Sequence, residues 1–339
     1  MEKIKYILIS IYGGGIKGII PARILYHIEK ILQKKLGNNQ ISLSDTIDII
    51  GGTSTGSLIA LAMSLKDEKN RFVYTLKDVL NYYLIEGKKI FYLSPIQLLH
   101  SLFGLESAKY PSEPLEASLE VLLGKSTLAD LKIPILIPAH ELKRGYLYFF
   151  TAHNYLDKKE NFFLKDIARA ATAAPTMFKP ALIQSLQGRN YSFVDGAVFA
   201  NNPSLCTYIE ACKLYPDLTP SNSLFLSLGT GYAKDKTPGV NLFSEAGTLD
   251  WLPYLLNIFM NNSVDLPEYQ LKYIYKMNNV PQNYIHLDFE LDPNKNEVDN
   301  ITRQYLQYLI ESTDDFLDSK NDLIEKIVSI LEEKLVFEK

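Results

Sequence analysis

Two strand-like segments near the N-terminus each run into a glycine-rich turn, and a helical pattern follows both turns. The first segment, "YILISIYGGG", starts at Tyr6 and leads into apolar residues at helical spacing that continue to Gly37. The second segment, "DTIDII", continues as "GGTSTG" and then as the apolar "SLIALAMSL". A strand, a tight turn and a helix in immediate succession, occurring twice, predict an α/β sheet with helices on its faces.

The size and charge of the chain narrow the classes of protein that it could be. With 339 residues, of which 47% are hydrophobic, it can bury a substantial core. It has no internal repeat and no low-complexity linker, so we expect one domain over residues 1–339, with a motif-bearing core over about 6–231 and a helical portion over about 245–339. A formal net charge of -4 gives no general attraction to nucleic acid, whose binding needs a concentrated basic face.

The cysteines and the N-terminal segment give expectations about the cellular compartment of the protein. Cys206 and Cys212 fall on one predicted helix, about 9 Å apart along its axis, so we expect no disulfide, as in a reducing compartment. The N-terminal apolar run lacks a cleavage site, which favours a first strand over a signal peptide. No uncharged apolar stretch reaches the roughly 18 residues of a membrane span. We therefore expect a cytoplasmic protein, or one that binds membranes peripherally.

The first glycine turn matches two nucleotide-binding patterns only in part. Gly13, Gly15 and Gly18 have the spacing of a dinucleotide fingerprint, but no acidic residue ends the second strand to hold a ribose. A phosphate-binding Walker loop also fails, because Ile19 stands where lysine should follow Gly18. The remaining interpretation is a loop whose N–H groups, at the start of a helix, hold a negative charge that forms during a reaction.

The second glycine turn, Gly52-Thr53-Ser54-Thr55-Gly56, is a G-x-S-x-G sequence between a predicted strand and a predicted helix. That context is typical of a nucleophile elbow, in which a strained turn lifts the serine hydroxyl out of the sheet. The alternative is a serine that caps the helix in an ordinary turn. Ser54 is therefore a candidate nucleophile.

A serine nucleophile needs a base, and the sequence offers two kinds. Of the histidines, only His286 comes late enough for the chain order of an α/β-hydrolase, and its segment "NYIHLDF" alternates like an ordinary strand. The other histidines are His27, His100, His140 and His153. The carboxylate candidate is Asp195 in "FVDGAVFANNP", at a predicted strand end where Gly196 allows close approach, although Asp-Gly is also a common turn sequence.

Read together, "GGGIKG", "GTSTG" and "DGA", with "ARAATAAPTMF" before the last of them, resemble the patatin-like phospholipase family and lie close to the plant-type motifs. The resemblance runs from about Tyr6 to Gly231. It implies a three-layer α/β/α fold with a central, mostly parallel sheet, and hydrolysis of lipid acyl esters by a Ser–Asp dyad without metal or cofactor. Matched by position, it implies that Ser54 is the nucleophile, that Asp195 is the base, that Gly13, Gly14 and Gly15 form the oxyanion hole, and that Lys17, Gly18, Gly52, Gly56 and Gly196 support these motifs.

One residue departs from the family pattern, because Tyr12 stands where the family usually has aspartate before the glycines. The family's basic residue in this loop is present as Lys17, which could support the loop, bind an anionic lipid or simply be solvated. The resemblance implies phospholipase A activity on glycerophospholipids. A non-catalytic lipid-binding or signalling module, and an acyltransferase, are the alternatives.

Lipid access requires an apolar entrance, and two stretches have a suitable composition. Residues Lys88–Leu105 combine two lysines with aromatic residues and leucines, and Trp251–Met260 is similarly apolar. Either stretch could line an entrance or contact a membrane surface, and either could equally be an ordinary core helix.

Overall fold

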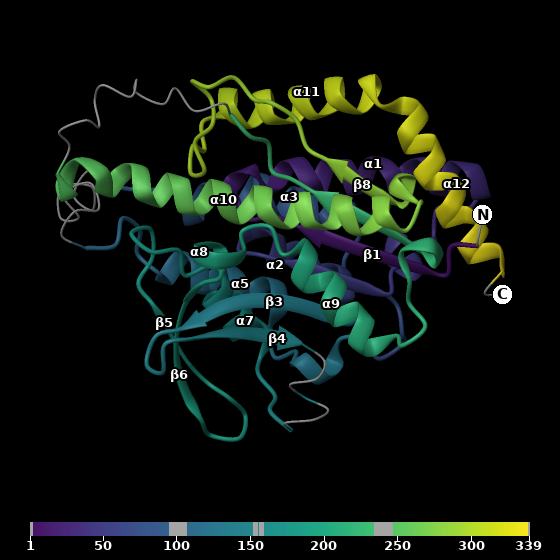
Figure 1. Ribbon diagram of the computed structural model, residues 1–339. Coiled ribbons are helices and arrows are strands. Elements are labelled where there is room, and N and C mark those ends of the chain that lie inside the picture. The colour runs from purple at the N-terminus through teal and green to yellow at the C-terminus, as the bar shows by residue number, and fades with distance from the viewer. Residues whose placement is uncertain (1–2, 95–106, 152–154, 156–158, 234–246, 338–339) are drawn as a thin grey trace.

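The computed structural model describes residues 3–94, 107–151, 155, 159–233 and 247–337 (Figure 1). Its strands are β1 (Tyr6–Ile11), β2 (Ile49–Gly52), β3 (Ile135–Glu141), β4 (Tyr146–Thr151), β5 (Ala181–Gln184), β6 (Asn190–Asp195), β7 (Ser223–Leu228) and β8 (Tyr284–Leu287). Its helices are α1 (Ile19–Leu36), α2 (Thr55–Ser64), α3 (Leu76–Ile90), α5 (Glu113–Leu123), α7 (Leu164–Ala171), α8 (Ala197–Ala200), α9 (Ser204–Leu214), α10 (Thr248–Met277), α11 (Arg303–Ser319) and α12 (Asn321–Phe337).

The described strands form one mixed sheet in the order β5-β6-β3-β2-β1-β7-β8, and β4 pairs with β3 outside this path. The pairs among β1, β2, β3, β7 and β8 are parallel, whereas β4 and β6 run antiparallel to β3. Most strands therefore point the same way, and the turns that follow β1 and β2 lie at one edge of the sheet, where ligands of open α/β sheets usually bind.

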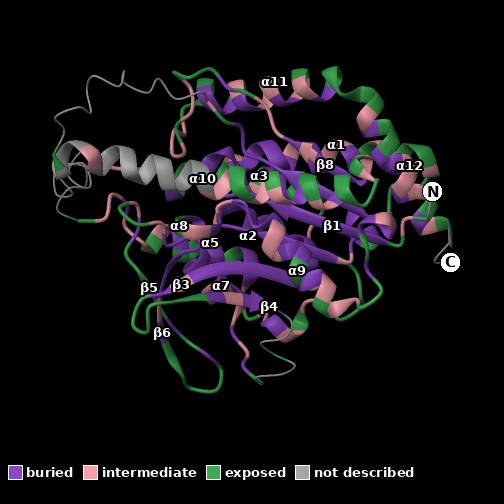
Figure 2. Cartoon of the chain, viewed as in Figure 1, coloured by how far each residue is buried: buried purple, intermediate pink, exposed green. Residues whose placement is uncertain are grey.

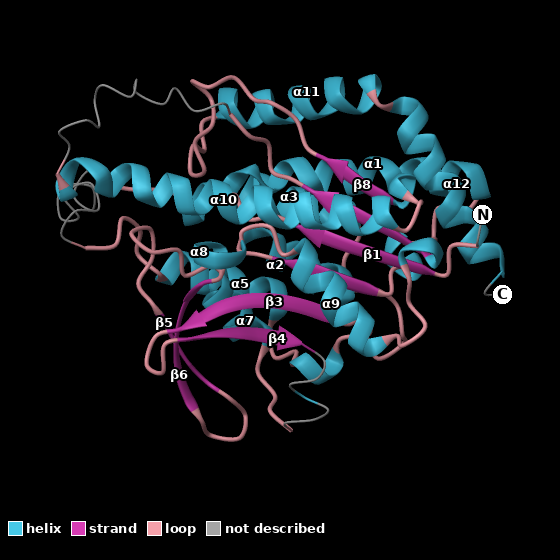
Figure 3. Cartoon of the chain, in the orientation of Figure 1, coloured by secondary structure: helices cyan, strands magenta, loops and turns pink. Residues whose placement is uncertain are grey.

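The sheet is buried between two layers of helices (Figures 2 and 3). Alternate residues of β1 point to opposite faces, as expected for a strand. Ile7 and Ile9 join the larger apolar cluster, which includes residues of α1, α2, α3, α5, α7, α11 and α12. Tyr6 and Leu8 join a smaller cluster with residues of α9 and α10. The predicted three-layer α/β/α architecture with a mostly parallel sheet is confirmed.

Both edges of β3 are occupied, and this arrangement brings two distant strand ends together. β4 pairs along one edge from Leu136 to Glu141, so β2 and β6 must share the other edge. β2 pairs there at Leu136 and β6 at Ala139, and the two strands run in opposite directions. The carboxyl ends of β2 and β6 therefore meet head to head along β3. Ser54 follows two residues after the end of β2, and Asp195 is the last residue of β6.

The ends of several elements follow from residues in the sequence. α7 ends at Ala171, ahead of Pro175, and α10 is continuous from Thr248 to Met277. α1 ends as predicted, with Gly37 at φ 62°. Both cysteines lie on α9 and are free thiols, as predicted. Among the described residues, no helix is both long and apolar enough to cross a bilayer.

Candidate active site

The turn that carries Ser54 has a strained backbone. Ser54 has φ 52° and ψ −119°, a conformation that costs a residue with a side chain roughly 1–3 kcal/mol. The flanking glycines are required by close contacts, because a Cβ on Gly52 would lie 2.3 Å from the Gly56 carbonyl oxygen, and one on Gly56 would lie 2.3 Å from that of Ile11. The result is a tight turn that leaves Ser54 half-buried at the N-terminus of α2, between buried neighbours.

Hydrogen bonds fix the residues on both sides of Ser54. The Thr53 hydroxyl donates to the Ala200 carbonyl at 2.6 Å. The Thr55 hydroxyl donates to the Tyr83 hydroxyl at 2.8 Å, and that hydroxyl donates in turn to the Thr55 carbonyl at 2.7 Å. A Cβ on Gly18 would lie 2.4 Å from the Thr55 Oγ1. The strained turn is therefore held by α8, by α3 and by the end of the first glycine loop.

Asp195 lies fully buried at the carboxyl end of β6. Its Oδ1 accepts a hydrogen bond from the Ala197 N–H at 2.8 Å, while its Oδ2 has no hydrogen-bond partner among the described residues. Burial raises the pKa of Asp195 to about 7, against the opposing effects of the Ser54 hydroxyl and the Ala197 N–H. The Ser54 hydroxyl therefore acts on the carboxylate by lowering its pKa, although no hydrogen bond between the two side chains is among the described ones.

Gly196 explains how Asp195 can sit so close to the neighbouring strand. A Cβ on Gly196 would lie 2.4 Å from the Pro138 carbonyl oxygen of β3. The Asp195 N–H donates to the Ala173 carbonyl at 3.0 Å, which fixes the backbone from the other side. A larger residue at position 196 would push this turn, and the carboxylate with it, away from β3.

The first glycine loop lies beside Ser54. A Cβ on Gly13 would lie 3.2 Å from the Ser54 Cβ. The Gly13 N–H donates to the Asn201 carbonyl at 3.1 Å and is therefore occupied. The N–H groups of Gly14 and Gly15 donate to no acceptor in the part of the chain that the structure describes, and both residues are half-buried. Of the three predicted oxyanion donors, Gly14 and Gly15 are the two available to a ligand.

Lys17 is buried rather than solvated, with 6% of its surface exposed. Its ammonium group donates to the Gly231 carbonyl at 3.0 Å and to the Asn296 Oδ1 at 2.7 Å. Burial lowers the pKa of Lys17 to about 8, and the charge of Asp288 acts in the opposite direction. Of the roles considered for Lys17, these contacts favour support of the loop.

The same loop is also held from the C-terminal third of the chain. The Ile16 N–H donates to the Val298 carbonyl at 2.8 Å, and a Cβ on Gly15 would lie 2.1 Å from that oxygen. Gly15 has φ +58°, so both its conformation and its space demand glycine. The polar segment 292–300, which carries Val298, is exposed at its start but half-buried from Lys295 except at Glu297. A backbone contact of this kind leaves no signal in the sequence.

Tyr12 is a buried structural residue on the side of β7 and β8. Its hydroxyl lies 2.8 Å from the Ser227 hydroxyl and accepts a hydrogen bond from Asn202 Nδ2 at 2.7 Å. Its ring stacks on His286 with 5.8 Å between the ring centroids. The substitution at this family position therefore contributes to the packing beneath the glycine loop and leaves the loop's free N–H groups in place.

Asn202 connects this polar cluster to two carbonyl groups of α10 that lie near Pro267. Pro267 lies inside α10 and has no N–H to offer the Ser263 carbonyl one turn earlier. The Asn202 N–H donates to that carbonyl at 3.3 Å, and its Nδ2 donates to the Val264 carbonyl at 2.9 Å. These partners on α10 lie more than sixty residues away along the chain, so the contact could not be predicted from the sequence around Asn202.

We expect Tyr12→Phe to destabilise the fold without removing activity. The change leaves the Asn202 amide and the Ser227 hydroxyl without the Tyr12 oxygen, and we expect it to lower the free energy of unfolding by about 1–2 kcal/mol. Urea denaturation measures this difference, and Tyr269→Phe, at a 60% exposed position on α10, is the matched control. Unchanged stability would contradict this assignment of Tyr12.

His286 contacts residues away from the strained turn. Its Nδ1 lies 3.2 Å from Glu268 Oε1, and its ring stacks on Tyr12. Burial opposes ionisation of Glu268, but hydrogen bonding and charge from His286 help to lower its pKa to about 2. No contact between His286 and Ser54 occurs among the described interactions. His100 and His153 lie outside the described residues.

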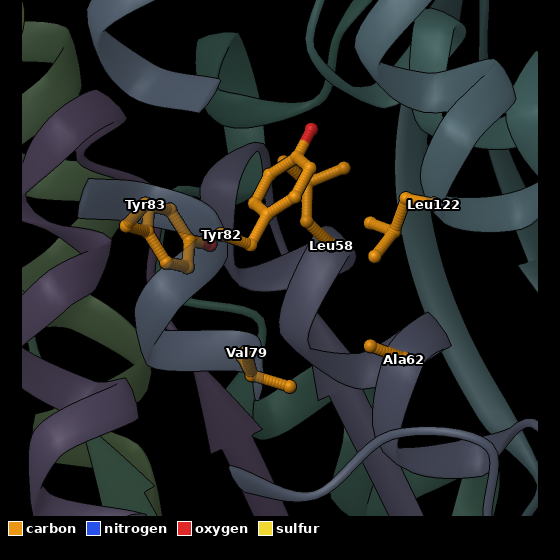
Figure 4. Close-up of a pocket in the computed structure, with 6 residues that line it drawn as sticks. All are labelled: Leu58, Ala62, Val79, Tyr82, Tyr83 and Leu122. Carbon is orange, nitrogen blue, oxygen red and sulfur yellow. The ribbon is translucent and has the colours of Figure 1, made fainter. Parts of the chain in front are cut away.

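A narrow apolar gap lies beside α2, the helix that starts after Ser54 (Figure 4). It is lined by Leu58, Ala62, Val79, Tyr82, Tyr83 and Leu122, and it has no room for a water molecule. An acyl chain therefore cannot occupy it without displacing these side chains. The predicted entrance Lys88–Leu105 lies partly outside the described residues, as do the side chains of Trp251–Met260 except that of Trp251.

Known proteins are similar to this chain over most of its length. A family model described as patatin-like phospholipase matches residues 9–205. Patatin-T5 of Solanum tuberosum is 31% identical over 328 residues, which cover 91% of this chain and 83% of that protein. Patatin-like protein 1 of Arabidopsis thaliana is 30% identical, with 89% and 79% covered. A third relative, "Probable inactive patatin-3-Kuras 1" of Solanum tuberosum, is 32% identical, with 83% and 77% covered. From the match over more than half of its length and from these relatives, the chain belongs to the patatin-like phospholipase family.

Proposed function

We propose that this protein is a lipid acyl hydrolase of the phospholipase A type, with Ser54 as nucleophile and Asp195 as general base. Membership of the family supports lipid acyl hydrolysis in general. The observation that carries the finer proposal is the head-to-head meeting of β2 and β6 on β3, which brings a buried carboxylate to the serine on a strained turn. Because one relative is named as inactive, the activity needs its own test.

The proposed reaction begins with Ser54 Oγ attacking the ester carbonyl carbon while its proton moves to the Asp195 carboxylate. A base with a pKa near neutrality suits this step, and burial gives Asp195 a pKa of about 7. The negative charge on the former carbonyl oxygen would be held by the Gly14 and Gly15 N–H groups and by the positive end of α2.

The intermediate then collapses, the bond to the alkoxy oxygen breaks, and Asp195 returns its proton to the leaving lysophospholipid. Water next attacks the acyl-enzyme and gives a proton to Asp195. The bond to Ser54 Oγ breaks, the serine takes the proton back, and the fatty acid leaves. Every step uses the same two side chains and the same pair of N–H groups.

The proposed substrate lies at a membrane surface, so we also propose peripheral contact with lipid. Two apolar side chains near the site support this. Val198 on α8, three residues after Asp195, is 43% exposed. Tyr232, next to the carbonyl that holds Lys17, is 47% exposed.

The test of this function is to incubate the purified protein with mixed glycerophospholipid vesicles and to identify the products by mass spectrometry. We expect free fatty acid and lysophospholipid, and covalent labelling of Ser54 by a fluorophosphonate probe. Transfer of the acyl group to an added alcohol in preference to water would show an acyltransferase. Neither product nor label, from a protein that still binds the vesicles, would show a non-catalytic lipid-binding module.

We expect His286→Gln to retain most of the activity, within about threefold of wild type in kcat. The reason is that His286 contacts Glu268 and Tyr12, while Asp195 supplies the base. Steady-state hydrolysis measures the effect, and thermal unfolding shows whether the variant is folded. If a folded His286→Gln protein were as inactive as Ser54→Ala, a triad would replace the proposed dyad.

A further inference from the structure

Asn201 lies between the first glycine loop, which contains Gly13, and the turn that carries Ser54. The Asn201 carbonyl accepts the Gly13 N–H at 3.1 Å, so it is tied to the glycine loop. The preceding carbonyl, of Ala200, accepts the Thr53 hydroxyl at 2.6 Å, so it is tied to the nucleophile turn. The backbone of Asn201 is therefore fixed relative to both.

The side chain of Asn201 lies against the same two turns, and its amide is unpaired. The point that a Cβ on Gly13 would occupy is 2.3 Å from Asn201 Oδ1 and 3.2 Å from the Ser54 Cβ. Oδ1 is buried and has no hydrogen-bond partner among the described residues. Asn201 as a whole is half-buried, and its Nδ2 donates to no residue that the structure describes. The side chain therefore keeps two N–H donors that no described residue uses, on a residue held between the glycine loop and the turn that carries Ser54.

The neighbouring asparagine shows what a purely structural role looks like here. Asn202 is 1% exposed, and its Nδ2 donates to both the Tyr12 hydroxyl and the Val264 carbonyl. Its Oδ1 accepts the Ser204 N–H at 2.9 Å. The Asn201 side chain differs, because its buried Oδ1 has no partner among the described residues and its Nδ2 donates to none of them, so no described hydrogen bond of this side chain serves the fold.

We infer that Asn201 is a further catalytic residue, whose Nδ2 donates a hydrogen bond to the substrate ester oxygen as that oxygen becomes negative. It would act as a side-chain donor beside the Gly14 and Gly15 N–H groups, and asparagine is a known type of donor for such charges. This inference rests on the proposed acyl hydrolysis at Ser54. It assigns a chemical role to the first asparagine of the "NN" that follows "DGAVFA" in this chain.

The test compares wild type with Asn201→Leu, which keeps a similar volume without a donor, and with Asn201→Ala, which excludes a steric effect of leucine. We expect kcat to fall about 10²–10³-fold in both, with KM little changed. Labelling of Ser54 by a fluorophosphonate should slow to a similar degree, because its phosphoryl oxygen needs the same donors. Melting temperatures should stay near that of wild type.

Two control variants separate catalysis from folding. Asn278→Ala, whose exposed Nδ2 donates only to the Ile274 carbonyl among its described contacts, should leave kcat unchanged. Asn202→Ala should lower the melting temperature, because it removes three hydrogen bonds.

Asn201 variants that keep kcat and the labelling rate within about threefold of wild type would overturn the inference. So would variants whose activity and melting temperature fall together, as expected for Asn202→Ala. A wild-type protein that is neither labelled nor active would instead overturn the proposed function, and the inference with it.

Discussion

Ser54→Ala is expected to lower phospholipid hydrolysis by at least about 10⁴-fold while the protein stays folded. The change removes the proposed nucleophile, and the half-buried hydroxyl leaves little space behind. Alanine at this position keeps the strained backbone of serine, so the melting temperature should hardly move. Fatty acid release and thermal unfolding measure the two effects, and Ser319→Ala at the exposed end of α11 is the control. Activity above a few per cent of wild type would exclude Ser54 as the nucleophile.

A second variant at position 54 separates the effect of backbone strain on stability from the effect of losing the nucleophile on activity. Glycine adopts φ 52° and ψ −119° without the cost that serine incurs, so Ser54→Gly should be as inactive as the alanine variant yet more stable than wild type by about 1 kcal/mol. Chemical denaturation would show this difference. A Ser54→Gly protein less stable than wild type would mean that the turn is held by contacts of the serine side chain.

Asp195→Asn is expected to lower kcat by about 10³–10⁴-fold, because asparagine keeps the shape of the side chain but cannot accept the serine proton. In wild type, kcat/KM should rise with pH as the carboxyl group, with a pKa of about 7, loses its proton. Steady-state kinetics from about pH 5 to about pH 9, roughly two units on either side of that pKa, measure both effects. A pH profile flat across this range would contradict the assignment.

The same substitution has an expected effect on stability that depends on pH. The folded-state pKa of Asp195 is raised from 3.8 to about 7. Between these values the unfolded chain loses a proton that the folded protein keeps, so wild-type stability falls as pH rises and then levels off above 7. Asparagine has no such loss, so the variant should gain roughly 2–4 kcal/mol over wild type above pH 7 relative to acid pH. Asp315→Asn, at an exposed position on α11, should show no such gain.

Local sequence signals predicted the parts of the site that depend on one turn each. The two glycine-rich turns, the serine between Gly52 and Gly56, and the aspartate before Gly196 all lie where strand-turn-helix patterns indicated. In each case a glycine is required by a backbone contact within a few ångströms. Such constraints act on residue type directly, so they are visible in a single sequence.

The relations between those turns could not be predicted from local patterns. The meeting of β2 and β6 depends on the length of β3, which offers one edge to both strands. The contact of Lys17 with Asn296 depends on how a loop far along the chain folds back. The position of Tyr12 near Ser227 depends on the register of β1 and β7. The prediction of a single domain over residues 1–339 stays a prediction.

The hydrogen bond from Ile16 to Val298 has a consequence for the timing of protein synthesis. The glycine loop and β1 leave the ribosome before β7, β8 and Val298, which pair with them directly or lie beside them and are made more than two hundred residues later. Contacts so distant in sequence form late and slowly. The glycine loop therefore lacks one of its backbone partners until Val298 has been made and has left the ribosome. In this order of synthesis, the N–H groups proposed as oxyanion donors reach their final positions only after residues far along the chain have folded back onto them.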